Sequence, residues 1–566
     1  MIRISELRLP VLAGEGEIRR KAASLLRVRE DKIRDFTILR RSIDARKRGM
    51  EIRFSYTVLL SLKDGGEERL LKRLGNPRLS LSEQKSYRIP ALPERISGKS
   101  REEYFSEYGN RPRIVGFGPA GMFAGLLLAR MGACPLIYER GGPVEEREKA
   151  VLSLWKDGRP DPSSNPQFGE GGAGTFSDGK LNTLVKDPDG RSRFVLSEFV
   201  RAGAPEEILI DGKPHIGTDL LLDIVRKIRE EILSLGGEIR FHSQYHFREE
   251  ESSPLILAIG HSARDSYREL LELGLSMRPK DFAMGFRIQH PQALIDRALY
   301  GEISEEMRRA LGPGAYKLSF TNSSGRALYS FCMCPGGYVI NASSEEGGLC
   351  VNGMSCHGRD SGTANSAIVM AIRKEDYGDG RDPMSGILLQ RELEERCFRL
   401  CGGRIPMQRY GAFRDAVSEE RGERDALPER LRDGEREPMS PAFRGLFSEA
   451  DLSTIFRFGE DSPYRSLNCF NALFIEGMES FSRRIPGFNR EDAVLCALES
   501  RTSSPIRIPR DEDFHSNLRF LYPCGEGAGY AGGIMSAAMD GMKTAEALSA
   551  DYCAGRIPWK SYREIL

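Results

Sequence analysis

Residues 113–121 read RIVGFGPAG, a short apolar run that ends in a glycine turn. Gly116, Gly118 and Gly121 match the pattern GxGxxG. In this pattern the glycines allow a tight turn, the approach of a pyrophosphate to the backbone, and close packing of a helix on a strand. Residues 122–131 are predicted to form that helix, whose N-terminus would offer unpaired N–H groups to phosphate. The stretch therefore predicts the start of a dinucleotide-binding fold.

An acidic residue is expected about 20 residues after the glycines, where its carboxylate holds ribose hydroxyls. Glu139 stands at that distance, at the end of a strand predicted over 135–138. Runs at 239–242 and 255–259 are predicted to continue the same sheet, and 219–235 has the spacing of an amphipathic helix. The order of strand, glycine turn, helix, strand and acid, each at the expected spacing, favours a dinucleotide site over a plain glycine turn.

The last fifty residues contain a second glycine turn. A strand is predicted over 520–522 and a helix over 534–548. Residues 522–527, YPCGEG, resemble the strand and turn that hold the ribityl chain and pyrophosphate of FAD. The N-terminus of that helix would stabilise negative charge on a reduced flavin. A GxGxxG turn inside a strand–helix–strand unit that ends in an acid occurs once, at Gly116, which argues against a permanent nicotinamide site, whereas transient docking of NAD(P)H stays open. Together these features predict FAD.

Composition restricts the class of protein. Of 566 residues, 40% are apolar and 29% charged, and because no run of eighteen apolar residues occurs, no membrane span is expected. The start of the chain lacks the long apolar stretch of a signal peptide. Eleven cysteines without CxxC spacing predict free thiols, a cytoplasmic location and no metal site. The oligomeric state stays open.

Charge is uneven along the chain. Residues 1–100 hold 24 Lys and Arg against 13 Asp and Glu, although the whole chain has a net charge of +1. Their strand–helix–strand–strand pattern predicts a small α+β module. This basic module either docks on the acidic remainder or binds nucleic acid. Sparse aromatic residues and the lack of a recognition motif favour docking.

The predicted fold class is α/β, with a discontinuous Rossmann-like FAD-binding domain, an inserted substrate domain of mixed or antiparallel β-structure, and a small N-terminal α+β domain. Strand-like runs in 282–345 carry the prediction of an inserted antiparallel sheet. The predicted parts are a basic module over 1–100, a linker over 101–112, FAD-binding parts over 113–280 and 516–566, and the inserted domain over 281–515.

Several stretches resemble a family of bacterial FAD-dependent dehydrogenases, the NAD(FAD)-utilising dehydrogenases, with a glutathione-reductase-type FAD fold. They are residues 165–181 (NPQFGEGGAGTFSDGKL), 213–221, 329–345, 351–355, 499–507 and 522–541. The resemblance implies FAD and an oxidoreductase-like fold, and it leaves the substrate open. Pattern and resemblance together assign to the cofactor Gly116, Gly118, Pro119, Ala120, Gly121, Glu139, Arg140, Gly171, Gly172, Gly174, Thr175, Lys180, Gly260, Gly525, Glu526, Gly532, Gly533 and Ile534.

Three residues, Cys334, His215 and Arg501, are candidates for catalysis. The CxC pair of Cys332 and Cys334 is expected to point its thiols to opposite faces of a strand, which favours packed, inert cysteines over a redox pair. His215 is either a base or a turn residue bonded to a backbone carbonyl. Arg501 is either an anion clamp or part of an ordinary ion pair. Lys180, which ends a glycine-rich loop, is expected to reach phosphate or flavin O2.

The main hypothesis is an FAD-dependent oxidoreductase that transfers a hydride between flavin N5 and an unidentified small organic substrate, beneath the inserted sheet. One alternative is an FAD-containing RNA-associated or RNA-modifying protein that uses the basic module. Another is a regulator that binds FAD without catalysis.

Overall fold

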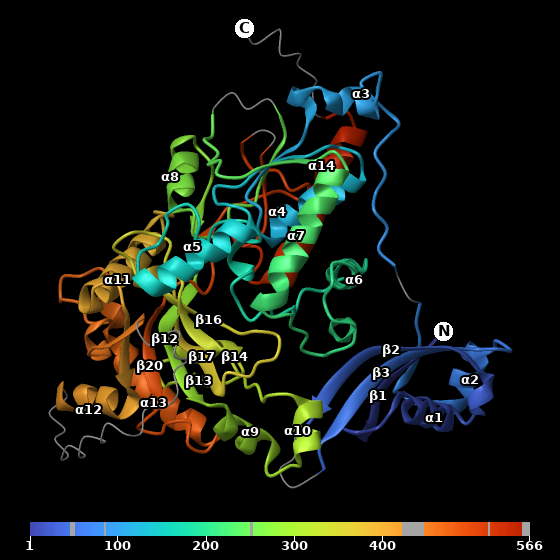
Figure 1. Cartoon of the computed structure of the whole chain (residues 1–566), viewed down its shortest axis with the longest axis horizontal. Coiled ribbons are helices and arrows are strands. Elements are labelled where there is room, and N and C mark those ends of the chain that lie inside the picture. Colours follow the sequence, from blue (N-terminus) through green and yellow to red (C-terminus); the bar gives the residue numbers. More distant parts are fainter. Residues whose placement is uncertain (46–50, 84–85, 249–252, 421–445, 519–520, 557–566) are drawn as a thin grey trace.

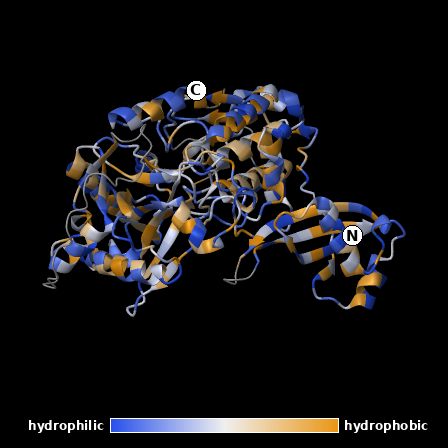
Figure 2. Ribbon diagram, turned by 60° about the horizontal axis from the view of Figure 1, so that its bottom comes forward, coloured by the Kyte–Doolittle hydropathy of each residue, from blue (hydrophilic) through white to orange (hydrophobic). Residues whose placement is uncertain are grey.

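The structure is a computed structural model that describes residues 1–45, 51–83, 86–248, 253–420, 446–518 and 521–556. A small N-terminal module stands to one side of a larger body, as both overall views show (Figures 1 and 2). The body contains a parallel sheet and a larger, mostly antiparallel sheet. The predicted α/β class is confirmed. Among the described residues, no helix has the length and apolar character needed to cross a membrane.

A parallel sheet forms the base of the nucleotide-binding part. Among the described residues its strands, in sheet order, are β22 (Leu521–Pro523), β10 (Leu255–Leu257), β7 (Arg113–Val115), β8 (Leu136–Tyr138) and β9 (Glu238–Arg240). Ile114 pairs with Ile256 on one side and with Ile137 on the other. Because β22 pairs with β10, the sheet joins segments from both ends of the body. Phe520, predicted to begin β22, lies outside the described residues.

Three helices pack on this sheet and on one another (Figure 1): α4 (Pro119–Arg130), α7 (Thr218–Ser234) and α14 (Ile534–Cys553). Helix α4 is apolar and buried almost all round, as expected of a helix enclosed by other elements. It lies so close to α14 that a Cβ added at Gly541 would overlap the carbonyl oxygen of Ala120. The two sequence-distant glycine turns are therefore held next to each other.

The inserted part is built on a long two-sided sheet. Its strands, in sheet order, are β13 (Ser319–Thr321), β14 (Ala327–Cys334), β17 (Thr363–Ile372), β12 (Phe282–Pro291), β20 (Val494–Glu499), β18 (Ile405–Arg409) and β19 (Phe447–Glu449). All described pairings are antiparallel except that of β18 with β19. Strand β12 is buried on both faces and packs Phe286 among aromatic rings of α12 (Tyr410–Glu420) and α13 (Phe470–Ser482).

Two smaller elements complete the side of this sheet that faces the nucleotide-binding part. The hairpin of β15 (Tyr338–Asn341) and β16 (Val351–Met354) lies beside β14 and β17, and α11 (Ser385–Cys401) packs next to β20. Helix α5 (Val144–Asp157) contacts β15, and the indole N–H of Trp155 donates to the carbonyl of Asn341. These contacts join the two parts of the body.

The N-terminal module has the order β1 (Ile2–Pro10), α1 (Glu15–Leu26), β2 (Ile33–Asp44), β3 (Arg53–Leu62), α2 (Glu67–Leu74) and β4 (Leu79–Leu81). The sheet order β2-β3-β1-β4 makes it a ferredoxin-like βαββαβ unit. It contacts the body through Arg41, whose guanidinium lies 2.6 Å from Asp211, and through α10 (Glu305–Leu311), whose Leu311 enters the module's core. At least one of its basic side chains thus pairs with the acidic body.

The segment predicted as a linker over 101–112 is partly helical. Helix α3 (Arg101–Ser106) begins at a capping box in which the Ser100 hydroxyl accepts from the N–H of Glu103. Tyr104 and Phe105 are buried, and the Phe105 ring centroid lies 5.3 Å from that of Tyr552 in α14. Because its two adjacent aromatic residues are buried, this segment is part of the hydrophobic core of the body. The otherwise polar composition of the segment did not indicate this.

Candidate active site

A cavity of about 370 Å³ lies between the two parts of the body. On one side it is lined at the carboxyl ends of the parallel strands, by Val115, Tyr138 and Ala258. On the other side the inserted part contributes residues such as Phe331 and Asn352. Ligands of open α/β sheets bind outside the carboxyl ends of the strands, so the position alone marks this cavity as the candidate site.

The nucleotide-binding side of the cavity is walled by glycine backbone. Gly116 has φ +99°, and a Cβ there would overlap the carbonyl of Ala258, so this glycine is required by the fold itself. A Cβ added at Gly260, Gly532 or Gly533 would instead meet no protein atom within 4 Å, although all three residues line the cavity. Because backbone without side chains lines the cavity at these three positions, a ligand can lie directly against the chain there.

Two helices begin at this cavity. Gly118 caps α4 with Pro119 in its first turn, and Gly533 caps α14, which begins at Ile534. All four residues line the cavity. Each N-terminus presents unpaired N–H groups and a positive partial charge, so two anionic or electron-rich groups of one ligand would find a partner here. A dinucleotide with a pyrophosphate at one helix and a flavin at the other fits this arrangement.

His261 gives an independent sign that the cavity takes a polar ligand. Its side chain is buried and lines the cavity, and neither ring nitrogen makes a hydrogen bond within the described residues. Its Nδ1 lies 3.2 Å from a carboxylate oxygen of Glu526, close enough for an ion pair when the ring is protonated. A buried imidazole without hydrogen bonds destabilises the folded protein, unless a bound ligand supplies the missing hydrogen-bond partners.

Glu139 has more partners than a simple ribose ligand would need. Its buried carboxylate accepts from the backbone N–H groups of Phe117, Gly141 and Gly169 at 2.8 to 3.0 Å. It therefore ties the glycine turn after β7 to the loop at 169, while still lining the cavity. The neighbouring Arg140 is bonded to Asp265 and stacks on Phe168, so its charge is balanced within the protein.

Fourteen of the residues predicted to bind the cofactor line the cavity, and four do not: Gly121, Gly171, Thr175 and Gly525. Gly121 packs α4 on the backbone of Gly116, and Gly171 packs on the hydroxyl of Thr175. A Cβ at Gly525 would lie 2.8 Å from that of Ala120. These four residues shape the walls rather than face the space, because glycines serve close packing as well as ligand approach.

His215, predicted as a candidate base, does not line the cavity. Its Nε2 lies 3.1 Å from the carbonyl oxygen of His357, and the two imidazoles stack with centroids 5.3 Å apart. Burial, with a smaller contribution from Arg359, lowers the pKa of His215 to about 4. The residue is a backbone-bonded neutral histidine, which is the second of the two interpretations that the sequence left open.

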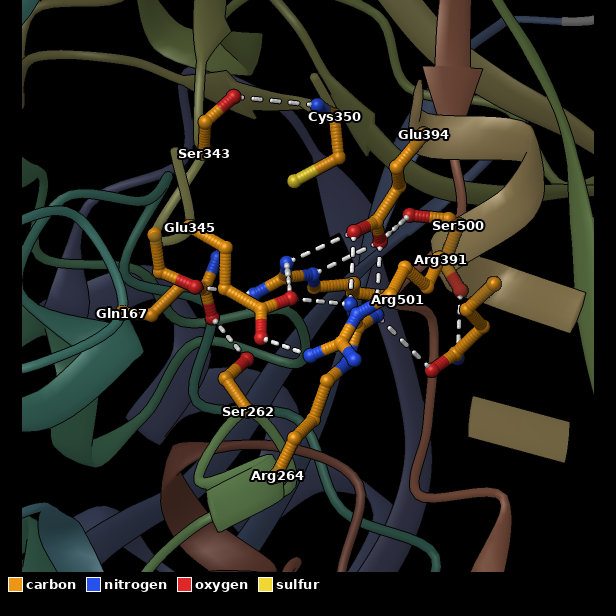
Figure 3. A network of polar contacts seen from close by, with 12 residues as sticks. Gln167, Ser262, Arg264, Ser343, Glu345, Cys350, Arg391, Glu394, Ser500 and Arg501 are labelled. Atoms are coloured by element: carbon orange, nitrogen blue, oxygen red, sulfur yellow. Dashed lines mark hydrogen bonds and ion pairs between the residues drawn. The ribbon is translucent and has the colours of Figure 1, made fainter. Parts of the chain in front are cut away.

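Arg501 lines the cavity but is not a free anion clamp. Its guanidinium donates to both oxygens of Glu394 at 3.0 and 2.9 Å, and Arg264 donates to the same two oxygens at 3.0 Å each (Figure 3). Glu345 joins the cluster through Arg264 and Arg391. The two arginines hold the pKa of Glu394 well below its usual range. This buried network fastens α11 to α8 (Arg264–Glu272) behind the cavity wall.

The expectation that Cys332 and Cys334 point apart is wrong. Residues two apart in a strand share a face, and here a bulge between Phe331 and Cys334 also gives Cys332 a φ of +45°. Lys180 Nζ lies 3.9 Å from Cys332 Sγ and 3.5 Å from Cys334 Sγ. Cys332 and Lys180 line the cavity, whereas Cys334, the predicted catalytic residue, is buried behind it.

Sequence reasoning missed several polar residues of the cavity. Asp178 and Glu499, both buried, line it together with Asn352 and His261. Asp178 pairs with Lys180 at 3.2 Å and with Arg359, and Glu499 pairs with Arg287. The position of Asp178, two residues before Lys180, could have indicated that these two side chains pair. Glu499 gives no such indication in the sequence, because its partner Arg287 lies on another strand. Among the described residues, no group of three or more metal-ligating side chains is gathered.

Comparison with known proteins places the chain in a family. Residues 281–434 match the model of the FAD-dependent protein, C-terminal domain-like family, and residues 1–61 match a domain of unknown function, DUF8436. An uncharacterised protein of Clostridium beijerinckii is 41% identical over 565 residues, which cover 96% of this chain and 98% of that one. The chain belongs to the family of this clostridial protein. It is a flavoprotein, and its cofactor is FAD.

Solved structures of flavin enzymes are distantly similar to this family member. CmlS, a flavin-dependent halogenase, is 11% identical with a TM-score of 0.32, and the alignment covers 79% of this chain and 59% of CmlS. The halogenase PltM is 12% identical with a TM-score of 0.32 (80% and 72% covered), and E. coli quinol fumarate reductase FrdA is 10% identical with a TM-score of 0.30 (81% and 72% covered). Similarity this low carries no conclusion about the reaction.

Proposed function

We propose that this flavoprotein is an oxidoreductase that transfers a hydride between flavin N5 and a small organic substrate bound beneath the inserted sheet. The observation that supports it best is the asymmetry of the cavity. Glycine backbone and helix N-termini line part of the cavity, which suits a bound dinucleotide. The ionisable side chains of Asp178, Lys180 and Glu499 line it where the loop at 178–180 meets the inserted part, which suits a reacting substrate.

The residues that would hold FAD follow from this asymmetry. Gly118 and Pro119 at the start of α4 would bind the pyrophosphate, and Glu139 would accept from a ribose hydroxyl with its remaining lone pairs. Gly533 and Ile534 at the start of α14 would face the flavin, whose bound form supplies the two-electron chemistry. The helix N-terminus there would stabilise negative charge that develops on the ring.

Polar side chains from both parts of the body would orient the substrate and exchange protons with it. Lys180, Asp178, Asn352 and Glu499 come from different segments and face one space. Lys180 supplies a cation held in place by Asp178 at 3.2 Å. The Oδ1 of Asn352 accepts from the N–H of Gly353 and from Arg287, so its Nδ2 is left to donate, which suits a substrate with a carbonyl or carboxylate oxygen.

A half-reaction test addresses the function directly. Purified yellow protein is mixed anaerobically with panels of alcohols, amines, 2-hydroxy acids and NAD(P)H, and bleaching of the flavin band is followed, with products identified by mass spectrometry. We expect one chemical class to bleach the flavin, and Asn352→Ala to slow that class while flavin content stays unchanged. If no donor bleaches the flavin and the chemically reduced protein passes electrons to no organic acceptor, the non-catalytic interpretation replaces this proposal.

The RNA-associated alternative gains no support from the site. The ferredoxin-like module contacts the body through Arg41 and Asp211, so at least one of its basic side chains is paired within the protein. Retention of the full protein on immobilised RNA at low salt, lost at high salt, would be required to reopen it. Transient docking of NAD(P)H stays a prediction, and the same bleaching assay tests it.

A further inference from the structure

Two thiols and one ammonium group meet at the edge of the cavity. The bulge in β14 turns Cys332 and Cys334 toward Lys180, whose Nζ lies within 4 Å of both sulfur atoms. Lys180 comes from the glycine-rich loop of the nucleotide-binding part, while the thiols belong to the inserted sheet. A cation shared by two neighbouring thiols favours a thiolate, so this cluster is chemically different from a pair of packed cysteines.

The hydrogen bonds distinguish the two thiols. The Cys334 Sγ–H donates to the carbonyl oxygen of Cys332 at 3.3 Å, so Cys334 keeps its proton. The neighbouring Cys334 thiol, followed by the charge of Lys180, holds the pKa of Cys332 well below its usual range, whereas the pKa of Cys334 is raised by the same neighbour and by burial. Other charged groups face the pair: Asp178 opposes the ionisation of Cys332, and Arg287 on β12 favours it.

The two thiols also differ in access. Cys332 is partly exposed and lines the cavity, in the same lining as Gly533 and Ile534 at the start of α14. Cys334 has no exposed surface. A reactive thiolate at the surface of the cavity with a protonated thiol directly behind it is the arrangement of an attacking and a resolving cysteine.

Cys350 provides an internal contrast. It also lines the cavity, but its thiol donates to the carbonyl of Ala342 at 3.3 Å, and burial raises its pKa to about 12. Exposure to the cavity is therefore not sufficient for reactivity in this protein. The shared cation and the neighbouring thiol belong to Cys332 and Cys334 and not to Cys350.

We infer that Cys332 and Cys334 form a redox-active dithiol that exchanges an electron pair with the flavin. This inference rests on the proposed function. In the oxidising direction an S–S bond forms between the Cys332 thiolate and Cys334, the S–H bond of Cys334 breaks, and two electrons with that one proton pass to the oxidised flavin. In the reverse direction the disulfide accepts the same two electrons and one proton. Lys180 is a positioning residue that stabilises the thiolate.

Counting electrons tests the inference on the intact protein. Anaerobic titration with dithionite of protein first oxidised with ferricyanide should consume two electron pairs per bound FAD in the wild type. Cys334→Ser should consume one pair, and Cys356→Ser, which removes a thiol outside the cavity lining, should still consume two. Consumption of one pair by the wild type would overturn the inference while leaving the flavin function intact.

A second readout does not depend on flavin at all. After oxidation, rapid alkylation and digestion, the peptide that holds Cys332 and Cys334 should carry an internal disulfide, two hydrogens lighter than its dithiol form.

In the reduced protein, iodoacetamide should modify Cys332 faster than Cys350. Lys180→Met should slow that modification about tenfold at pH 7, because loss of one neighbouring cation raises a thiol pKa by about one unit, and Lys180→Arg should restore it. Equal alkylation rates for Cys332 and Cys350, or two free thiols after oxidation, would refute the dithiol. A protein that binds no FAD but forms this disulfide would refute only the flavin partner.

Discussion

The two sides of the cavity are built by different means. The nucleotide-binding side is shaped by backbone where Gly116 follows the end of a strand and Gly533 precedes the start of a helix. The inserted side is shaped by buried ion pairs, of which Arg287 with Glu499 and Arg501 with Glu394 adjoin the lining. The first side suits a ligand that always binds in the same orientation. The second side holds charged groups and thiols, and these groups can differ between related proteins that catalyse different reactions.

The largest effect is expected on the charged side. Arg287→Met leaves Glu499 buried without a partner, which costs about 4 kcal/mol in the free energy of unfolding. Arg287 has no exposed surface and bonds Glu499 at 2.9 and 3.2 Å. Urea unfolding measures the loss. Arg309→Met in the exposed pair with Glu305 should change stability by less than about 0.5 kcal/mol, and comparable losses in both variants would contradict the contrast between buried and exposed pairs.

On the backbone side, Gly116→Ala should cost about 3 kcal/mol, because the added Cβ overlaps the carbonyl of Ala258 and the residue must keep a positive φ. Thermal unfolding of the flavin-free protein measures this without any ligand effect. Gly274→Ala is the matched control, since Gly274 also has a positive φ (+83°) but a Cβ there meets nothing within 4 Å. Equal destabilisation would mean that strain alone, and not the close approach of β10, makes Gly116 necessary.

Acid should weaken the inserted part through His290. This residue of β12 is fully buried, with Nε2 2.7 Å from the carbonyl of Phe488, and burial lowers its pKa to about 4. The unfolded chain, with an ordinary pKa near 6.5, binds the proton first, so stability present at pH 7.5 is lost as pH falls toward 4. Between pH 7.5 and 5 the loss from this one group is about 2 kcal/mol.

His290→Gln should remove that part of the pH dependence, as urea unfolding at both pH values would show. His246→Gln, at an exposed histidine, should keep the full dependence. A wild-type-like pH profile in His290→Gln would exclude the buried imidazole as a source of acid sensitivity.

The smallest effect distinguishes glycines required by the fold from those that face the ligand. Gly533 has φ 169°, an extended conformation open to any residue, and its Cβ would point into open space. Gly533→Ala should therefore leave the unfolding free energy unchanged but weaken FAD binding about tenfold, which corresponds to about 1.4 kcal/mol. Flavin fluorescence during dialysis measures the release. Unchanged affinity would place FAD away from the start of α14.

The difference between the two sides also explains what could be predicted. The strand at 113–115, the helix after it and the acid at Glu139 follow each other closely, so their pattern is local and was readable. Of the predicted cofactor residues that line the cavity, those around Gly116 and Glu139 follow from this local pattern, whereas those in the loop that ends at Lys180 were assigned by the family resemblance. The burial of Tyr104 and Phe105 within the predicted linker over 101–112 could not be predicted from the sequence, because it depends on Tyr552, far away in the chain.

The sequence by itself determined the α/β class, the glycine turn at Gly116 and the choice of FAD, because backbone conformation and helix capping depend on neighbouring residues. Only the tertiary structure decided the chemistry of the opposite side. Arg501 became a partner of Glu394, His215 was turned away from the cavity, and Lys180 was placed between Cys332 and Cys334. The charge and reactivity of a side chain depend on the side chains that contact it. Here these contacts join segments that are more than a hundred residues apart in the chain.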